Sequence, residues 1–190
     1  MTAFDDLTRL VPPPPNPLGA NGDWNEVEAA LGVQLPADFK QLVRAYGAHH
    51  FAEFLTPLTP FAGRDLLVGP AKRLLEQERG FRDRYPEDSP YPFYPEPGGL
   101  LPWAGTDNGD RVCWLTAGKP DAWTVVCWNP RGWSYDAHPV GAVEFLVGWL
   151  SGRISTSVFP DATESAESVE SAEFAEFAES VESVESAEEG

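Results

Sequence analysis

The stretch that decides the fold is DWNEVEAALGVQLPADFKQLVRAYG, residues 23–47, which predicts two short helices and marks both ends of each. Asp23 is a favourable N-cap, and Glu26 follows three residues later, the spacing of a capping box. Gly32 ends the first helix, because glycine adopts the left-handed conformation at a helix end without steric cost. These signals predict a helix over residues 24–31.

The second helix of this stretch is predicted over residues 36–46. Pro36 suits the first turn, where a missing N–H costs nothing, and Asp38 favours the positive end of the helix dipole. Gly47 marks the end of the helix. One apolar face follows from the spacing i, i+3, i+4, i+7 of Phe39, Leu42, Val43 and Tyr46. This face predicts that the helix packs on a core.

Outward from these helices, the second half of the chain has the pattern of an antiparallel meander. Asn108-Gly109 is a strong hairpin signal, because both central positions of a type I′ turn require positive φ. After His138-Pro139 the apolar spacing changes to that of a closing helix. The expected strands are 51–58, 66–68, 101–105, 111–115, 124–128 and 133–135. The predicted fold class is α+β, with N-terminal helices packed on a mostly antiparallel sheet and a C-terminal helix closing it.

The chain is expected to divide into three parts. Residues 1–22 form a Pro-rich N-terminal segment, in which Pro12–Pro15 favour a stiff polyproline-II spacer. Residues 23–160 form the α+β domain. Residues 161–190 form an acidic tail of Glu-Ser-Ala/Val repeats, whose like charges and few large apolar groups predict disorder.

Charge separates an ordinary acidic body from a strongly acidic tail. The whole chain carries 30 acidic and 13 basic residues, a net charge of −17, and the tail accounts for −11 of it. The remaining 19 acidic and 13 basic residues leave −6 for residues 1–160. Direct nucleic-acid binding is not expected, because it requires clustered Lys and Arg. An acidic body suits a basic protein partner, although solubility alone gives the same composition.

The chain is predicted to be cytoplasmic, because its sequence lacks the features of secretion and of membrane insertion. The N-terminus lacks the basic and apolar regions of a secretory signal, and no apolar run reaches the ~18 residues of a membrane span. Cys113 and Cys127 lie in apolar runs, as expected of buried reduced thiols rather than a disulfide framework.

Three groups of residues have both a chemical and a plainer structural interpretation. A metal site could use His49, His50, Glu53 and His138, but the first two fit loop histidines after a helix. Calcium at Asp107, Asn108 and Asp110 competes with the turn itself. A Cys113–His138 nucleophile pair lacks an electropositive setting. No metal or other cofactor and no catalytic residue is therefore predicted.

A partner-binding surface is predicted on the meander, where acidic turn residues recur beside aromatic ones. Aromatics at this density form a core first and an interface second, and each acidic residue alone is an ordinary turn residue. Together on one rim they would present carboxylates around aromatic anchors. The candidates are Glu96, Trp103, Asp107, Asp110, Asp121, Trp133 and Tyr135.

The order of these motifs resembles the SUKH superfamily, which includes the Smi/Knr cell-wall regulators. The resemblance rests on Leu35-Pro36-x-Asp38-Phe39 with the helix ending at Tyr46-Gly47, on Leu101–Gly109 followed by Trp114, and on the closing helix up to Gly152. It implies a bacterial immunity protein that binds and neutralises a toxin, or an interaction scaffold, as in eukaryotic members. It brings no catalytic residues. A basic toxin domain is therefore the expected partner, with an intracellular scaffold and a metal-dependent enzyme as alternatives.

Overall fold

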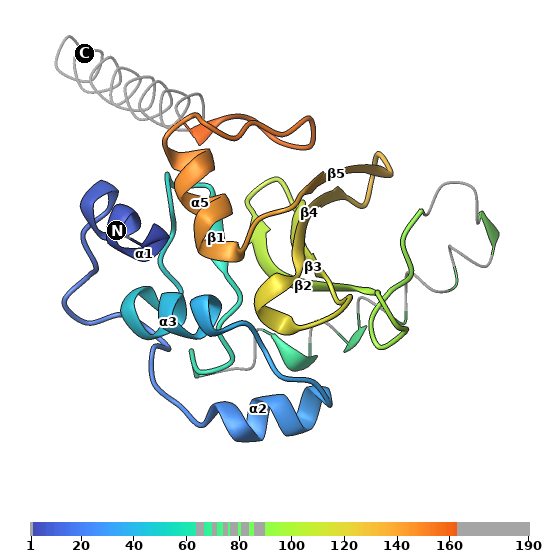
Figure 1. Cartoon of the computed structure of the whole chain (residues 1–190), viewed down its shortest axis with the longest axis horizontal. Coiled ribbons are helices and arrows are strands. Elements are labelled where there is room, and N and C mark those ends of the chain that lie inside the picture. The colour runs from blue at the N-terminus through green and yellow to red at the C-terminus, as the bar shows by residue number, and fades with distance from the viewer. Residues whose placement is uncertain are drawn as a thin grey trace, which may run out of the picture.

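A computed structural model of the chain describes residues 2–63, 67–69, 72, 73, 76, 80, 84, 85 and 90–162. Within them, helices pack on one five-stranded antiparallel sheet (Figure 1). The predicted α+β class is therefore confirmed. The disorder predicted for the tail concerns residues that, apart from 161 and 162, lie outside the described ones.

The sheet is a meander in which every strand pairs with its neighbour in sequence. The strand order is β1-β2-β3-β4-β5, and all pairs are antiparallel. The strand predicted at 51–58 is shorter than expected, and the one predicted at 66–68 is wrong, because its described residues 67 and 68 are not in a strand. The other four agree with the prediction to within a few residues at each end. The strands are β1 Leu55–Pro57, β2 Leu100–Thr106, β3 Arg111–Leu115, β4 Thr124–Asn129 and β5 Ser134–His138.

The hairpin predicted at Asn108-Gly109 is present, but its turn type differs from the prediction. Among the described residues in this turn only Gly109 has positive φ, at +83°. Its N–H donates to the Thr106 carbonyl (2.9 Å), and Thr106 N–H donates to the Asp110 carbonyl (3.1 Å). The longer loop needs one left-handed residue instead of two, and glycine supplies it.

The two helices of the deciding stretch are α2, Trp24–Leu31, and α3, Ala37–Tyr46. The Asp23 carboxylate accepts from Asn25 N–H at 2.8 Å, and Gly32 has φ +82°, so the predicted N-cap and helix end of α2 are present. The capping box predicted with Glu26 is not formed, because among the described residues only the Asp23 side chain caps this helix. Pro36 stands at the N-cap of α3, one position before the expected one. The predicted apolar face of α3 is fully buried.

The N-terminal segment is more than the spacer that its prolines predict. Residues Ala3–Leu10 form helix α1, which packs on α5 (Figure 1). Leu7 is fully buried, and the Tyr46 hydroxyl donates to the Val11 carbonyl at 2.6 Å. The boundary at residue 22 stays a prediction, but residues on both of its sides share one core.

The closing helix α5, Ala142–Leu150, begins after the predicted His138-Pro139, because β5 extends through His138 and Gly141 is the N-cap. It packs with α3 and α1, on the side of the sheet that carries the main core (Figure 1). The other side carries a smaller cluster of Phe93, Leu100, Cys113, Val126 and Trp128. The two cysteines thus belong to different clusters.

Candidate functional site

One residue of the predicted surface, Trp103, lies inside the molecule. Its side chain is fully buried and packs against Phe39 (ring centroids 6.0 Å apart) and Trp114 (5.8 Å). The prediction of an exposed anchor at this position is wrong. The apolar face of α3 covers the inner side of β2, and a tryptophan there contributes to the core instead of to a surface.

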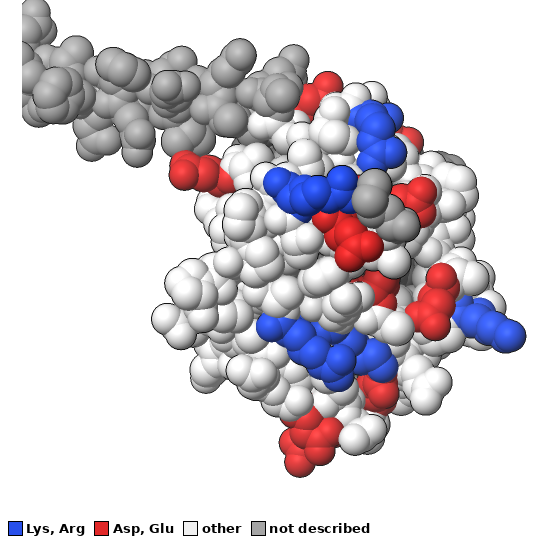
Figure 2. Space-filling model, turned by 60° about the vertical axis from the view of Figure 1, so that its left-hand side comes forward, with Lys and Arg blue, Asp and Glu red and all other residues white. Residues whose placement is uncertain are grey.

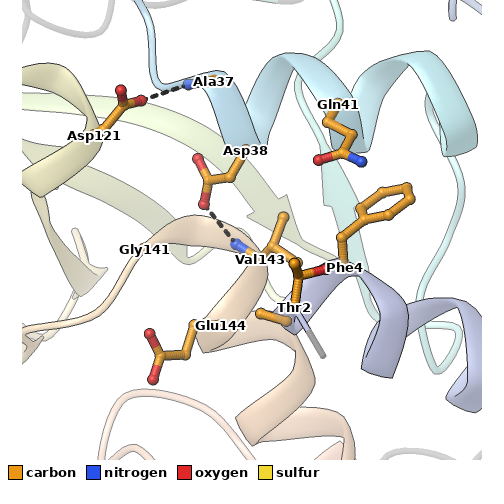
Figure 3. A pocket seen from close by; sticks show the side chains of 10 residues that line it. Thr2, Phe4, Ala37, Asp38, Gln41, Asp121, Gly141, Val143 and Glu144 are labelled. Carbon is orange, nitrogen blue, oxygen red and sulfur yellow. Dashed lines mark hydrogen bonds between the residues drawn. The ribbon is translucent and has the colours of Figure 1, made fainter.

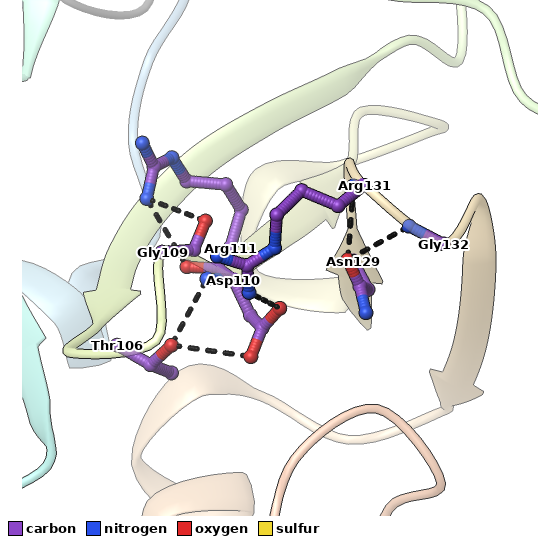
Figure 4. Close-up of polar contacts among 7 residues, drawn as sticks. All are labelled: Thr106, Gly109, Asp110, Arg111, Asn129, Arg131 and Gly132. Atoms are coloured by element: carbon purple, nitrogen blue, oxygen red, sulfur yellow. Dashed lines mark hydrogen bonds and ion pairs between the residues drawn. The ribbon is translucent and has the colours of Figure 1, made fainter.

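Asp110 is also buried, with 2% of its surface exposed, so its prediction as a rim residue is wrong. Its side chain closes the β2–β3 turn: the Thr106 hydroxyl donates to it at 3.4 Å, and Arg131 reaches it at 3.4 Å from the next turn at this end of the sheet (Figure 4). Burial raises the pKa of Asp110, and the charges of Arg131 and Arg111 oppose the shift. The Asp110 carboxylate is therefore a hydrogen-bonding part of the β2–β3 turn.

The remaining candidates are spread over the molecule instead of sharing a rim. Asp107 is exposed and lies 3.1 Å from the His50 ring. Asp121 lies in the short 3-10 helix η2, Pro120–Ala122, at the opposite end of the sheet, because successive turns of a meander alternate between ends. Trp133 and Tyr135 are half-buried against the smaller cluster, and Glu96 is a half-buried residue of the loop before β2.

A hollow of about 390 Å³ lies instead where α1, α3, η2 and α5 meet. Thr2 and Phe4 line it from α1, Asp38 and Gln41 from α3, and Asp121 from η2. Gly141, Val143 and Glu144 line it from α5 and its N-cap (Figure 3). Asp121 is the one predicted site residue that this hollow contains.

Two of its carboxylates are positioned by the ends of helices. Asp121 Oδ1 accepts from Ala37 N–H at 2.7 Å, at the start of α3. Asp38 Oδ2 accepts from Val143 N–H at 3.1 Å, at the start of α5, and its Oδ1 accepts from Phe39 N–H at 2.7 Å. A negative charge at a helix N-terminus is stabilising. These contacts hold α3, η2 and α5 together and fix both carboxylates at the hollow.

A second hollow of about 290 Å³ continues the first along α1 and α5. The two share Ala3 and Glu144, and the second adds Asp6, Val147 and Arg153. We name the pair the α1 groove. Figure 2 shows a view turned toward the side that carries α1, in which acidic and basic side chains alternate instead of forming one charged patch.

The sequence contains a signal for α1, one wall of this groove, that the prediction missed. Thr2 and Asp5 form a capping box, with Asp5 N–H donating to the Thr2 hydroxyl and Thr2 N–H donating to the Asp5 carboxylate. The spacing Thr-x-x-Asp is readable from the sequence and marks a helix start. The nearby run of prolines is typical of a stiff spacer, and the prediction followed this pattern instead of the capping box.

The structure offers no setting for nucleophilic cysteine chemistry in the residues described. Cys113 and Cys127 are buried free thiols, as predicted, and burial raises the pKa of each thiol well above its usual range. Among the described residues, no three His, Cys, Asp or Glu side chains gather as a metal site. In the same part of the chain, no helix has the length and apolar character to cross a membrane.

Comparison with known protein families gives a match. The sequence pattern of the SMI1-KNR4 cell-wall family, SUKH_6, matches residues 21–146. No match was found among curated proteins or among solved structures. The matched range includes α2, α3, all five strands and the first half of α5. Since this is most of the chain and nearly all of the sheet-and-helix core, the chain belongs to the SUKH superfamily, in the SMI1-KNR4 cell-wall family.

Proposed function

We propose that this chain is an immunity protein that neutralises a toxin by binding it in a stoichiometric complex, without catalysis. The observation that carries the proposal is the SUKH match over residues 21–146. What the resemblance implies for bacterial members of this superfamily is binding and neutralisation of toxins. The partner would be a basic toxin domain, since residues 1–160 carry a net charge of −6 and opposite charge speeds association.

The arrangement of side chains supports binding over chemistry. The α1 groove offers carboxylates, one amide and apolar surface, and its two helix-bound carboxylates are already occupied by backbone N–H groups. The thiols are buried, and a neutral buried thiol is a poor nucleophile. Two reduced cysteines in apolar surroundings also suit action in the cytoplasm.

The test is capture followed by neutralisation. The full chain, tagged at its carboxyl end, is used to isolate a partner from its native cells, and the partner is then expressed alone and together with the chain. We expect the partner alone to arrest growth, co-expression to restore it, and the purified pair to form a complex of fixed stoichiometry. A partner that is harmless alone, or whose toxicity persists in the complex, contradicts the proposal.

A further inference from the structure

We propose that the α1 groove receives an arginine side chain presented, next to an apolar residue, by an exposed loop of the partner protein. The identity of the partner as a toxin rests on the proposed function. The chemistry of the groove does not depend on it. In this proposal α1, the helix that precedes the family match, determines which partner binds.

The shape of the groove fits a protruding side chain. Its larger hollow, at about 390 Å³, is within the ~300–1,000 Å³ of pockets that enclose much of a small ligand. Ala3, Phe4, Val143 and Val147 give the two hollows apolar surface. An aliphatic stem or a neighbouring apolar side chain would be desolvated against this surface, which is favourable.

The charge of the larger hollow selects a cation, whereas Arg153, the basic residue that lines the groove, belongs to the second hollow. Figure 3 shows Asp121, Asp38 and Glu144 along one side of the larger hollow, with Phe4 and Gln41 on the other. Asp38 and Asp121 contribute acidic side chains to this side, and their oxygens accept backbone N–H groups. The Glu144 carboxylate is exposed, and no hydrogen bond or ion pair to it occurs within the described residues.

Among cations, the geometry favours arginine over lysine. A guanidinium has five N–H donors in a rigid plane, and it binds carboxylates from two directions while its face lies on apolar or aromatic surface. A lysine ammonium is a more strongly hydrated point charge, which gains less from the apolar side of the groove.

The walls of the groove come partly from outside the family match. Thr2, Ala3 and Phe4 precede residue 21, and Val147 and Arg153 follow residue 146, so they lie outside the family match. Asp38, Asp121, Val143 and Glu144 lie inside it. The groove thus combines carboxylates from the family core with walls from outside the matched range, and these walls set the shape that a partner loop must fit.

The groove is tested without any toxin, using small probes on the full chain. The probes are N-acetyl-leucyl-arginine amide and its lysine and citrulline analogues, since citrulline keeps the shape of arginine without its charge. We expect saturable NMR shifts at the amides of Ala37, Gly141 and Val143 with a dissociation constant on the order of 1 mM for the arginine probe. The citrulline probe should bind at least about tenfold more weakly.

Two glutamine-to-arginine variants provide a matched pair. Gln41→Arg places a guanidinium in the groove itself, whereas Gln34→Arg adds the same charge at an exposed position outside it. Gln41→Arg should abolish the arginine-probe shifts and Gln34→Arg should retain them, with both variants keeping the melting temperature of the parent. Equal binding of arginine and citrulline probes, shifts that map elsewhere, or insensitivity to Gln41→Arg would each overturn the inference.

A partner that passes the neutralisation test adds an independent readout. Glu144→Gln should weaken the affinity of the partner by at least about tenfold. Glu26→Gln makes an equal charge change at an exposed position of α2 and should leave the affinity within about twofold. If the probes bind as expected but no toxin exists, the groove stands and the proposed function fails. If the toxin binds and neither Glu144→Gln nor Gln41→Arg matters, the groove inference fails and the function stands.

Discussion

Gly47, at the end of α3, is a place where the backbone of the N-terminal segment passes close to the helix. It has φ +57°, and a Cβ placed on it would lie 2.1 Å from the Leu18 carbonyl oxygen. The neighbouring Ala48 N–H donates to that same oxygen at 2.9 Å. The backbones can approach this closely only because residue 47 has no side chain.

Gly47→Ala should therefore destabilise the fold by more than about 2 kcal/mol, because backbone strain and a steric clash add up. Gly63→Ala separates the two effects, since Gly63 has φ +77° and no atom within 4 Å of its added Cβ. We expect about 1 kcal/mol for Gly63→Ala. Urea unfolding of both variants measures the difference, and equal losses would mean that the Leu18 contact contributes nothing.

Asp110 carries a testable pH dependence. Burial raises its pKa in the folded chain, so the folded state binds the proton more tightly than the unfolded state does. The ionised carboxylate therefore opposes folding above its ordinary pKa, and the parent protein recovers this stability as the pH falls through the raised value. The stability of Asp110→Asn relative to the parent should be greatest near neutral pH and should decline on acidification.

The measurement is the free energy of unfolding of parent and Asp110→Asn across the acidic range. Asp107→Asn serves as the control because Asp107 is exposed in the same turn, although it also contacts His50. A difference between parent and Asp110→Asn that does not change with pH would show that the Arg131 contact fully compensates the buried charge.

At the scale of elements, α1 is expected to belong to the cooperative core. Leu7→Ala should destabilise by about 2–4 kcal/mol, as a fully buried leucine does when truncated. Leu10→Ala, in the same helix but with Leu10 48% exposed, should change stability by less than about 0.5 kcal/mol. Thermal or urea unfolding measures both, and a small loss for Leu7→Ala would make α1 an independent appendage.

The elements that were predicted correctly have ends marked by local chemistry. The start of α2 at Asp23, its end at Gly32 and the buried face of α3 all follow from short-range rules that the tertiary structure does not override. The errors occur where two rules compete. The prolines after Val11 masked the Thr2–Asp5 capping box, and the Asn108-Gly109 pair fits a longer loop as well as a two-residue turn.

The candidate groove could not be predicted because its residues come from four separate elements. Asp121 and Asp38 are 83 positions apart in the sequence, and both lie at the groove because each accepts an N–H at the start of a helix. Trp103 and Trp133 look equally suited to an interface in the sequence. Trp103 belongs to the core because it lies on the side of the sheet that α3 covers.

For the whole molecule, we expect the fold to be complete without residues 163–190. Every helix and strand described above lies within residues 2–162, and Ala162 is itself packed in the core. A chain ending at residue 162 should therefore keep a melting temperature within a few degrees of the full chain. Differential scanning fluorimetry or calorimetry tests this, and loss of cooperative unfolding would show that the tail contributes to the fold.

Thr2, at the rim of the α1 groove, has a practical consequence for anyone who purifies this protein. A fusion partner or affinity tag joined ahead of it would emerge beside the carboxylates of Asp38 and Glu144. A polyhistidine tag, positively charged in mildly acidic buffer, would then compete with any cationic ligand and weaken its apparent affinity. Interaction screens with amino-terminal fusions would miss genuine partners, whereas the same screens with carboxyl-terminal fusions would detect them.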